Sequence, residues 1–153
     1  VSAELNGFWA DTGASFPVGK ISTRASALLW TTRQALEEAL AEVRTGAPIR
    51  NIGRAVERRA KQNGFSVVRD LCGHGVGRHI HEEPSIPNTT RGATGTLWEG
   101  LVMTIEPFLT TSATRVVEDA DGWTLRTPDG SRGAQFEHTL IVTRDGPLVV
   151  TRS

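Results

Sequence analysis

The sequence contains a single cysteine and no apolar run approaching the roughly 20 residues that a membrane-spanning helix needs. The lone Cys72 excludes an internal disulfide, which fits a reducing compartment such as the cytoplasm. Charge of one sign is not in excess, because 17 basic residues balance 17 acidic ones. This balance favours neither nucleic acid nor an anionic membrane as a partner. No signal peptide opens the chain, and Met103 is the only methionine, so Val1 begins either a processed chain or a piece of a longer one.

The chain is long enough for one domain with a hydrophobic core, and we interpret 1–153 as a single domain. Residues 1–18 predict a β-hairpin, because Asn6-Gly7 is a strong two-residue turn signal. Apolar residues at three- and four-residue steps predict helices over 23–45 and 50–63. Gly46 and Pro48 would end the first helix, and Gly64 the second.

The remainder of the chain predicts strands and loops. Apolar, β-prone runs predict strands over 65–71, over 101–109, and as a pair over 134–151. The stretch 114–127 predicts two short strands around a turn at Ala120-Asp121, and the polar residues 85–96 predict a loop. A hairpin, two helices and then several strands are typical of an α+β fold, with helices on one face of a mainly antiparallel sheet.

Two acidic residues lie in otherwise apolar strand segments, Glu106 in TIEPF and Glu137 in QFEHTLIV. An isolated ionised carboxylate in a core is very costly, so buried acids are paired, protonated or bound to metal. On a strand, Glu137 and His138 point to opposite faces, and Glu137 shares its face with Gln135. A plainer alternative stays open, in which both acids have local hydrogen-bond partners or end their strands at the surface.

His74 is flanked by glycines in CGHGVGRHIHEEP, residues 72–84. Glycine permits close backbone approach and unusual φ values, which suits holding an imidazole nitrogen toward a centre. A structural bend with a solvent-facing histidine is the alternative. Asp11, in FWADTGASF, is by itself typical of a turn or cap residue.

Familiar motifs built on these residues fit poorly. GHGVGR has Arg78 where G-x-G-x-x-G needs glycine, and no G-K-[ST] follows for a phosphate loop. HEEPS has Ser85 where H-E-x-x-H needs a second histidine, and Pro84 would break that helix. A Cys72 nucleophile would have to pair with His74 only two residues away on a strand-like bend, which is awkward geometry.

The residues that remain are three carboxylates and one imidazole: Asp11, His74, Glu106 and Glu137. Oxygen-rich sites with one nitrogen suit Mn, Fe, Co or Zn. Three carboxylates in one place would repel one another unless divalent cations compensate them. Two cations about 3.5–4 Å apart would generate hydroxide at neutral pH. The sequence therefore indicates a centre with two divalent metal ions, provided that the fold brings these side chains together.

At the level of whole segments, the sequence resembles the C-terminal part of the type I methionine aminopeptidases, which have the pita-bread fold. The matching segments are NGFWADTGASFPVG, FSVVRDLCGHGVGRHIHEEP, MTIEPF, DGWTLRT and AQFEHTLIVT, in the family's order. The H-G-x-G…H-E-x-P element is shared with prolidases, aminopeptidase P and creatinase. The combination of FSVVRDLCGHGVG, DGWTLRT and AQFEHT is specific to the methionine enzymes. The resemblance implies a curved antiparallel sheet with helices on its outer face.

The resemblance also implies an activity and a ligand set. The activity is removal of the N-terminal methionine from nascent proteins and peptides, by a hydroxide bound to two divalent metal ions. Asp11 and Glu137 would be bridging ligands, His74 the single histidine ligand, and Glu106 both a ligand and the general base.

Three further residues match positions that contact the substrate. His81 would be a catalytic residue and not a ligand, because it matches the histidine that contacts the scissile-bond region and stabilises the tetrahedral intermediate. Ile80 and Trp123 would line the pocket for the methionine side chain, with phenylalanine common at the position of Ile80.

One more aspartate ligand of the family would precede Val1, and the N-terminal half supplies a second catalytic histidine and much of the substrate pocket. We therefore expect this chain alone to be inactive unless that missing half is supplied. The other expected partners are the N-terminal segment of nascent polypeptides and the ribosome. We expect the protein to be a monomer that binds neither nucleic acid nor a membrane. Two alternatives remain: a proline-specific peptidase of the same fold, and a non-catalytic binding module.

Overall fold

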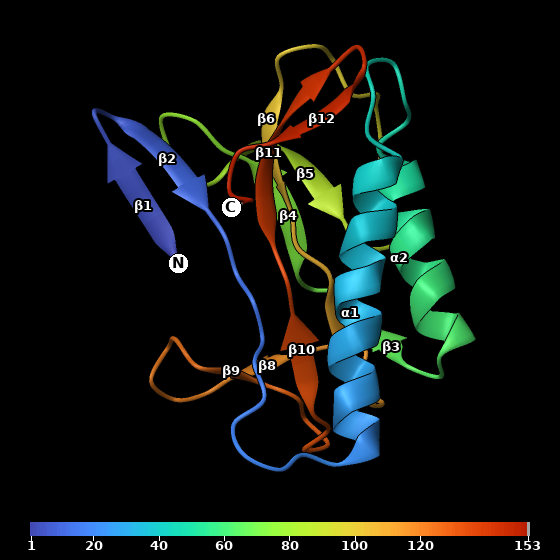
Figure 1. Ribbon diagram of the computed structural model, residues 1–153. Helices are drawn as coiled ribbons and strands as arrows, with labels where there is room; N and C mark the ends of the chain where they lie inside the picture. The colour runs from blue at the N-terminus through green and yellow to red at the C-terminus, as the bar shows by residue number, and fades with distance from the viewer. Residues whose placement is uncertain (153) are drawn as a thin grey trace.

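Helices α1 (Thr23–Ala41) and α2 (Arg50–Gln62) lie side by side against one side of the β-sheets (Figure 1). The computed structural model describes residues 1–152. Ser22 begins α1, since its hydroxyl accepts a hydrogen bond from the Ala25 N–H. The first helix ends at Ala41 and not at the predicted residue 45, because Thr45 donates its N–H to Thr143 in the sheet. Beyond α2, Gly64 has a φ of 70°, which fits its predicted role as a stop.

The strands form two main sheets, and every pair among the described residues is antiparallel. The larger sheet has the order β12-β11-β6-β4-β5, and its strands are Gly146–Val149, His138–Thr143, Val102–Ile105, Cys72–Gly75 and Glu82–Pro87. The smaller has the order β10-β7-β3, and its strands are Gly133–Gln135, Phe108–Thr110 and Ser66–Val67. Two separate hairpins complete the fold: β1 (Ser2–Leu5) with β2 (Phe8–Asp11), and β8 (Val117–Glu118) with β9 (Leu125–Arg126). The α+β prediction is confirmed.

Two segments that the sequence predicts as continuous strands are each broken at an acidic residue. Glu106 and Pro107 separate β6 from β7, and Glu137 lies in the gap between β10 and β11. Pro107 has no N–H to contribute to a ladder, so pairing stops there. At each break the chain passes between the larger and the smaller sheet. Both acids therefore lie where the two sheets meet, and the prediction that they lie within strands is wrong.

Other boundaries also differ from the pattern-based expectations. The first hairpin turns at Asn6-Gly7 as predicted but ends at Asp11 instead of residue 18. The predicted strand 65–71 is reduced to Ser66–Val67, and β5 takes up the start of the predicted loop 85–96. The additional strand β5 forms because it pairs with β4, which local sequence cannot reveal.

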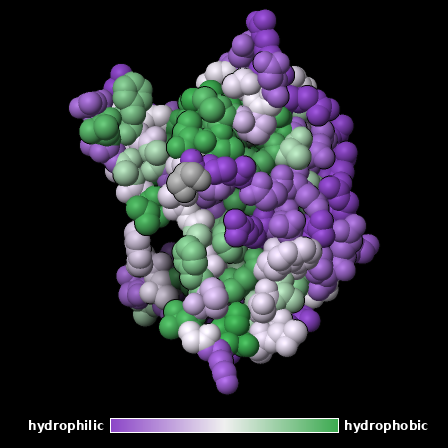
Figure 2. Space-filling model, in the orientation of Figure 1, coloured by the Kyte–Doolittle hydropathy of each residue, from purple (hydrophilic) through white to green (hydrophobic). Residues whose placement is uncertain are grey.

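The hydrophobic core fills the space between the helices and the sheets. Its largest fully buried side chains include Ile52, Val56, Ile86, Met103, Leu109 and Leu140. Hydrophilic residues cover the side where α1 and α2 lie, whereas apolar side chains are exposed on and near the β1–β2 hairpin (Figure 2). Within residues 1–152 we find no helix with the length and hydrophobicity needed to cross a membrane.

Candidate metal centre

The structure brings together the four residues that the sequence predicts as ligands. Asp11, His74 and Glu137 each present a ligand atom within 4.8 Å of the others. Glu106 joins them, because its Oε1 lies 3.3 Å from His74 Nε2. The four residues come from the end of β2, from β4 and from the two breaks between sheets. Each acid also has a local hydrogen-bond partner, Thr104 for Glu106 and Gln135 for Glu137, but neither acid lies at an exposed strand end.

The glycines around His74 serve close packing. A Cβ atom at Gly75 would collide with the main-chain oxygen of Glu83, and one at Gly73 with that of Thr104. Neither glycine has a positive φ, so the predicted unusual φ values are wrong while the predicted close approach is confirmed. Strand β4 can therefore lie tightly against β5 and β6, which places the His74 side chain at the centre.

The ring of His74 has a defined tautomer. Its Nδ1 lies 3.0 Å from the carbonyl oxygen of Gly75, which can only accept, so Nδ1 carries a proton. Nε2 is left to face Glu106. Burial lowers the pKa of His74, but the hydrogen bonds to Glu106 and Gly75, together with the negative charges of Glu106 and Glu137, outweigh it and raise the pKa above its ordinary value. A divalent cation would compete with the proton on Nε2.

Glu137 is the most informative ligand candidate, because half of its carboxylate has no partner. It is only 5% exposed. Its Oε2 accepts a hydrogen bond from Gln135 Nε2 at 3.0 Å, which confirms that both residues share a face. Its Oε1 is buried without any hydrogen-bond partner among the described residues. Burial, together with the negative charges of Glu106 and Asp11, raises the pKa of Glu137 to about 7. An orphaned oxygen in a negative cluster fits a bound cation.

Two threonines and one glutamine that contact these residues were not identified as site residues from the sequence. Thr104 donates its hydroxyl to Glu106 Oε1 at 3.3 Å, and Thr139 bonds to the main chain of Asp11. A local signal existed for Thr104, which lies two residues before Glu106 in the pattern T-x-E, because residues two apart in an extended segment share a face. No local pattern indicates that Thr139 bonds to Asp11.

The predicted substrate-contacting residues lie at different distances from the centre. His81 is exposed, and its ring meets that of His74 edge-on with 4.4 Å between centroids. Ile80 is half-buried beside it. Trp123 is 86% exposed in the turn between β8 and β9, where its main-chain N–H donates to the carboxylate of Asp121. The structure thus groups His81 with the centre, and the role of Trp123 stays a prediction.

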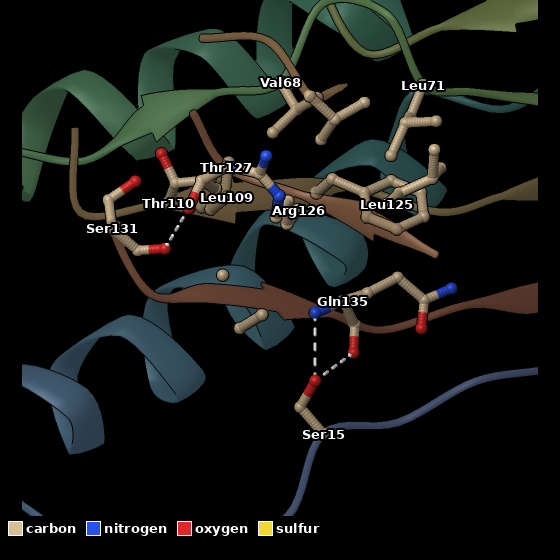
Figure 3. Close-up of a pocket in the computed structure, with 14 residues that line it drawn as sticks. Ser15, Val68, Leu71, Leu109, Thr110, Leu125, Arg126, Thr127, Ser131 and Gln135 are labelled. Atoms are coloured by element: carbon tan, nitrogen blue, oxygen red, sulfur yellow. Dashed lines mark hydrogen bonds between the residues drawn. The ribbon is translucent and has the colours of Figure 1, made fainter. Parts of the chain in front are cut away.

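A cavity of about 520 Å³ opens beside the centre, between the smaller sheet and the β8–β9 hairpin (Figure 3). Its walls are mainly apolar and include Val68, Leu71, Phe108, Val116 and Leu125. Gln135, which holds Glu137, also lines this cavity. One wall residue of the cavity is therefore hydrogen-bonded to a member of the carboxylate cluster.

An antiparallel α+β fold that gathers three carboxylates and one imidazole around an unsatisfied buried oxygen has the architecture of a metal-binding hydrolase. The sequence profile described as metallopeptidase family M24 matches residues 1–144, so the chain belongs to this family. Membership of a metallopeptidase family implies that it binds a divalent metal.

Curated relatives and solved structures identify enzymes within this family that the chain resembles. The chain is 41% identical over 154 residues to methionine aminopeptidase 2 of Bacillus subtilis, covering 99% of the chain and 62% of the relative. It is 37% identical to the crystal structure of methionine aminopeptidase from Thermotoga maritima, with a TM-score of 0.95, covering 99% of the chain and 61% of that structure. The X-Pro aminopeptidase from the same organism shares only the fold, at 20% identity and a TM-score of 0.76, over 99% of the chain and 38% of that structure.

These comparisons confirm the predicted pita-bread fold. They also show that the chain spans about three fifths of the length of the curated relatives it matches.

Proposed function

We propose that the protein to which this chain belongs removes the N-terminal methionine from proteins and peptides by metal-dependent hydrolysis. The observation that carries this proposal is the convergence of Asp11, His74, Glu106 and Glu137 on one buried centre. The 41% identity to a methionine aminopeptidase supports the choice of substrate over the fold-level likeness to proline-specific enzymes. Since the chain covers 62% of that relative, the activity is proposed for the protein with the rest of the fold in place.

The four clustered residues would hold two divalent cations, which are Co, Mn, Fe or Zn by their ligand chemistry. Asp11 and Glu137 would bridge them, His74 would ligate through Nε2, and Glu106 would complete the set. When bound, such ions polarise the scissile carbonyl and activate water at neutral pH.

The chain's own residues would move the protons. Glu106 is partly exposed, so its carboxylate can accept a proton from the attacking water and pass it to the leaving amine. His81 lies at the exposed rim beside His74, where its ring can donate a hydrogen bond to the oxygen that becomes negative. These roles assign His81 and Glu106 as the catalytic residues.

The apolar cavity is the proposed pocket for the side chain of the substrate's first residue. Its aliphatic and aromatic lining suits an unbranched apolar side chain such as methionine. Gln135 would connect substrate binding to the carboxylate cluster, because it lines the cavity and bonds to Glu137. Ile80, half-buried beside His81, and Trp123, in the turn between β8 and β9, are the other residues proposed to contact this side chain.

The partners follow from this activity. The N-terminal segment of a nascent polypeptide is the proposed substrate, which places the protein in the cytoplasm, near the ribosome. The N-terminal half of the fold would supply the remaining ligand and histidine. We propose that 1–153 is one catalytic unit and that the complete protein is a monomer.

The test uses the protein together with the rest of its fold, loaded with Mn²⁺ or Co²⁺. We expect release of methionine from a Met-Ala-Ser peptide, loss of activity after chelation, and loss in a Glu106→Gln variant that still binds metal. Cleavage of X-Pro peptides alone would replace the proposal with a proline-specific peptidase. A protein that binds no metal and does not respond to added Mn²⁺ or Co²⁺ would be a binding module.

A further inference from the structure

Two buried threonines lie opposite each other on neighbouring strands at the metal centre. Thr104 on β6 and Thr139 on β11 are direct cross-strand partners. They are 0% and 1% exposed. Because residues directly opposite in an antiparallel pair project from the same face, their hydroxyls lie on one side of the sheet. Each hydroxyl contacts residues of the candidate ligand set.

The Thr104 hydroxyl connects two candidate ligands. It accepts a hydrogen bond from the main-chain N–H of His74 at 3.1 Å. It donates one to Glu106 Oε1 at 3.3 Å. A single side chain thus fixes the strand that carries His74 relative to the carboxylate of Glu106.

The Thr139 hydroxyl fixes a third ligand by its main chain. It accepts a hydrogen bond from the Asp11 N–H at 2.9 Å and donates one to the Asp11 carbonyl at 2.7 Å. Within the described residues, β2 pairs with β1 and has no main-chain ladder to β11. The Thr139 side chain therefore replaces strand pairing at Asp11, and the bridge between Gly13 and Glu137 continues the contact. The hydrogen bonds on either side of Asp11, from Trp9 to Gly77 and from Thr12 to Glu137, do not involve Asp11 itself.

We propose that Thr104 and Thr139 act as a pair of positioning residues that preorganise the metal centre. This inference rests on the proposed function, because it assumes that the clustered residues bind cations. Three carboxylates in a metal-free site repel one another, so the protein has to hold them together before a cation arrives. Threonine suits this task because its β-branch restricts χ1 and keeps the hydroxyl aimed at its two partners. Groups that orient ligands typically change metal affinity by about 10- to 100-fold when removed.

The experiment measures Mn²⁺ affinity by isothermal titration calorimetry and thermal unfolding of the metal-free protein. Thr104→Val and Thr139→Val keep the side-chain shape and remove the hydroxyl, and we expect each to weaken Mn²⁺ binding by about 10- to 100-fold. Thr104→Ser and Thr139→Ser keep the hydroxyl and should restore most of the affinity. The matched control is Thr31→Val on α1, where Thr31 is 0% exposed and its hydroxyl has no partner among the described residues. This control should leave Mn²⁺ affinity unchanged.

The outcomes separate the inference from the function it rests on. If the parent binds Mn²⁺ and both valine variants bind it within twofold of the parent, the positioning role is wrong while the metal centre stands. If the valine variants lose only thermal stability, the threonines are structural and the inference fails in the same way. Should a valine variant not fold, serine and alanine variants replace it, since they differ in the hydroxyl. The serine variant must then bind Mn²⁺ at least tenfold more tightly than the alanine variant, and equal affinities would overturn the proposal. A parent that binds no Mn²⁺ contradicts the proposed function instead.

Discussion

Glu137→Gln should make the metal-free protein more stable while it abolishes metal binding. The carboxylate of Glu137 is buried beside Glu106 and Asp11, and its Oε1 has no partner among the described residues. Glutamine has nearly the same shape and carries no charge. Its Nε2 could donate to the neighbouring carboxylates, and its Oε1 could still accept from Gln135. The substitution therefore removes a repulsion without opening a cavity.

The magnitude follows from the pKa of Glu137, which rises from 4.5 to about 7 on folding. This displacement corresponds to at most about 3 kcal/mol against the ionised form in the folded state. The folded state binds more protons than the unfolded state between these values, so stability falls as pH rises from about 4.5 through about 7. At pH 8 the variant should gain up to about 3 kcal/mol, or about 6–12 °C in Tm for a chain of this size. At pH 5 the gain should be below about 1 kcal/mol, because folded Glu137 is then mostly protonated.

The assay is urea unfolding and thermal unfolding at pH 5 and pH 8, with chelator and with Mn²⁺. With Mn²⁺ the parent should become more stable than the variant, because the parent gains stability from the bound ion and the variant does not. Glu118→Gln is the control, since Glu118 is exposed on β8 and its replacement should change stability by less than about 0.5 kcal/mol. A Glu137→Gln variant that is less stable than the parent at pH 8 in chelator would refute the reasoning.

Three further predictions follow from the site. The metal-free parent should itself lose stability between pH 5 and pH 8, since the raised pKa values of Glu137 and His74 act in the same direction; a flat profile in urea titrations would contradict this. Gly75→Ala should destabilise the fold by about 1–3 kcal/mol through its collision with the Glu83 oxygen, whereas Gly133→Ala, whose added methyl would make only ordinary van der Waals contacts, should be nearly neutral in the same unfolding assay. His81→Ala should leave Mn²⁺ affinity within a few-fold of the parent but lower kcat by about 100-fold or more on a Met-Ala-Ser peptide, and a matching loss of affinity would show that His81 is a ligand instead.

The types of residue at the centre were predictable from the sequence because their chemistry is local. His74 between two glycines, and acids in apolar segments at 106 and 137, are unusual wherever the chain folds. Burial of such groups is costly without compensation, so the pattern alone predicted a compensating site. The two helices followed equally from their apolar periodicity, as the buried positions of α2 at Ile52, Val56 and Ala60 confirm.

What the tertiary structure decided is the set of contacts that join distant residues. Thr139 and Asp11 are 128 positions apart, and no local pattern shows that the Thr139 hydroxyl would bond to both the main-chain N–H and the carbonyl oxygen of Asp11. The strand breaks at Glu106 and Glu137 likewise depend on two sheets meeting, because each half of the broken segment pairs with a different partner set. Side-chain chemistry and local periodicity are properties of the chain itself. The positions of ligands and of the groups that hold them depend on which strands pair, and only the packed fold fixes that pairing.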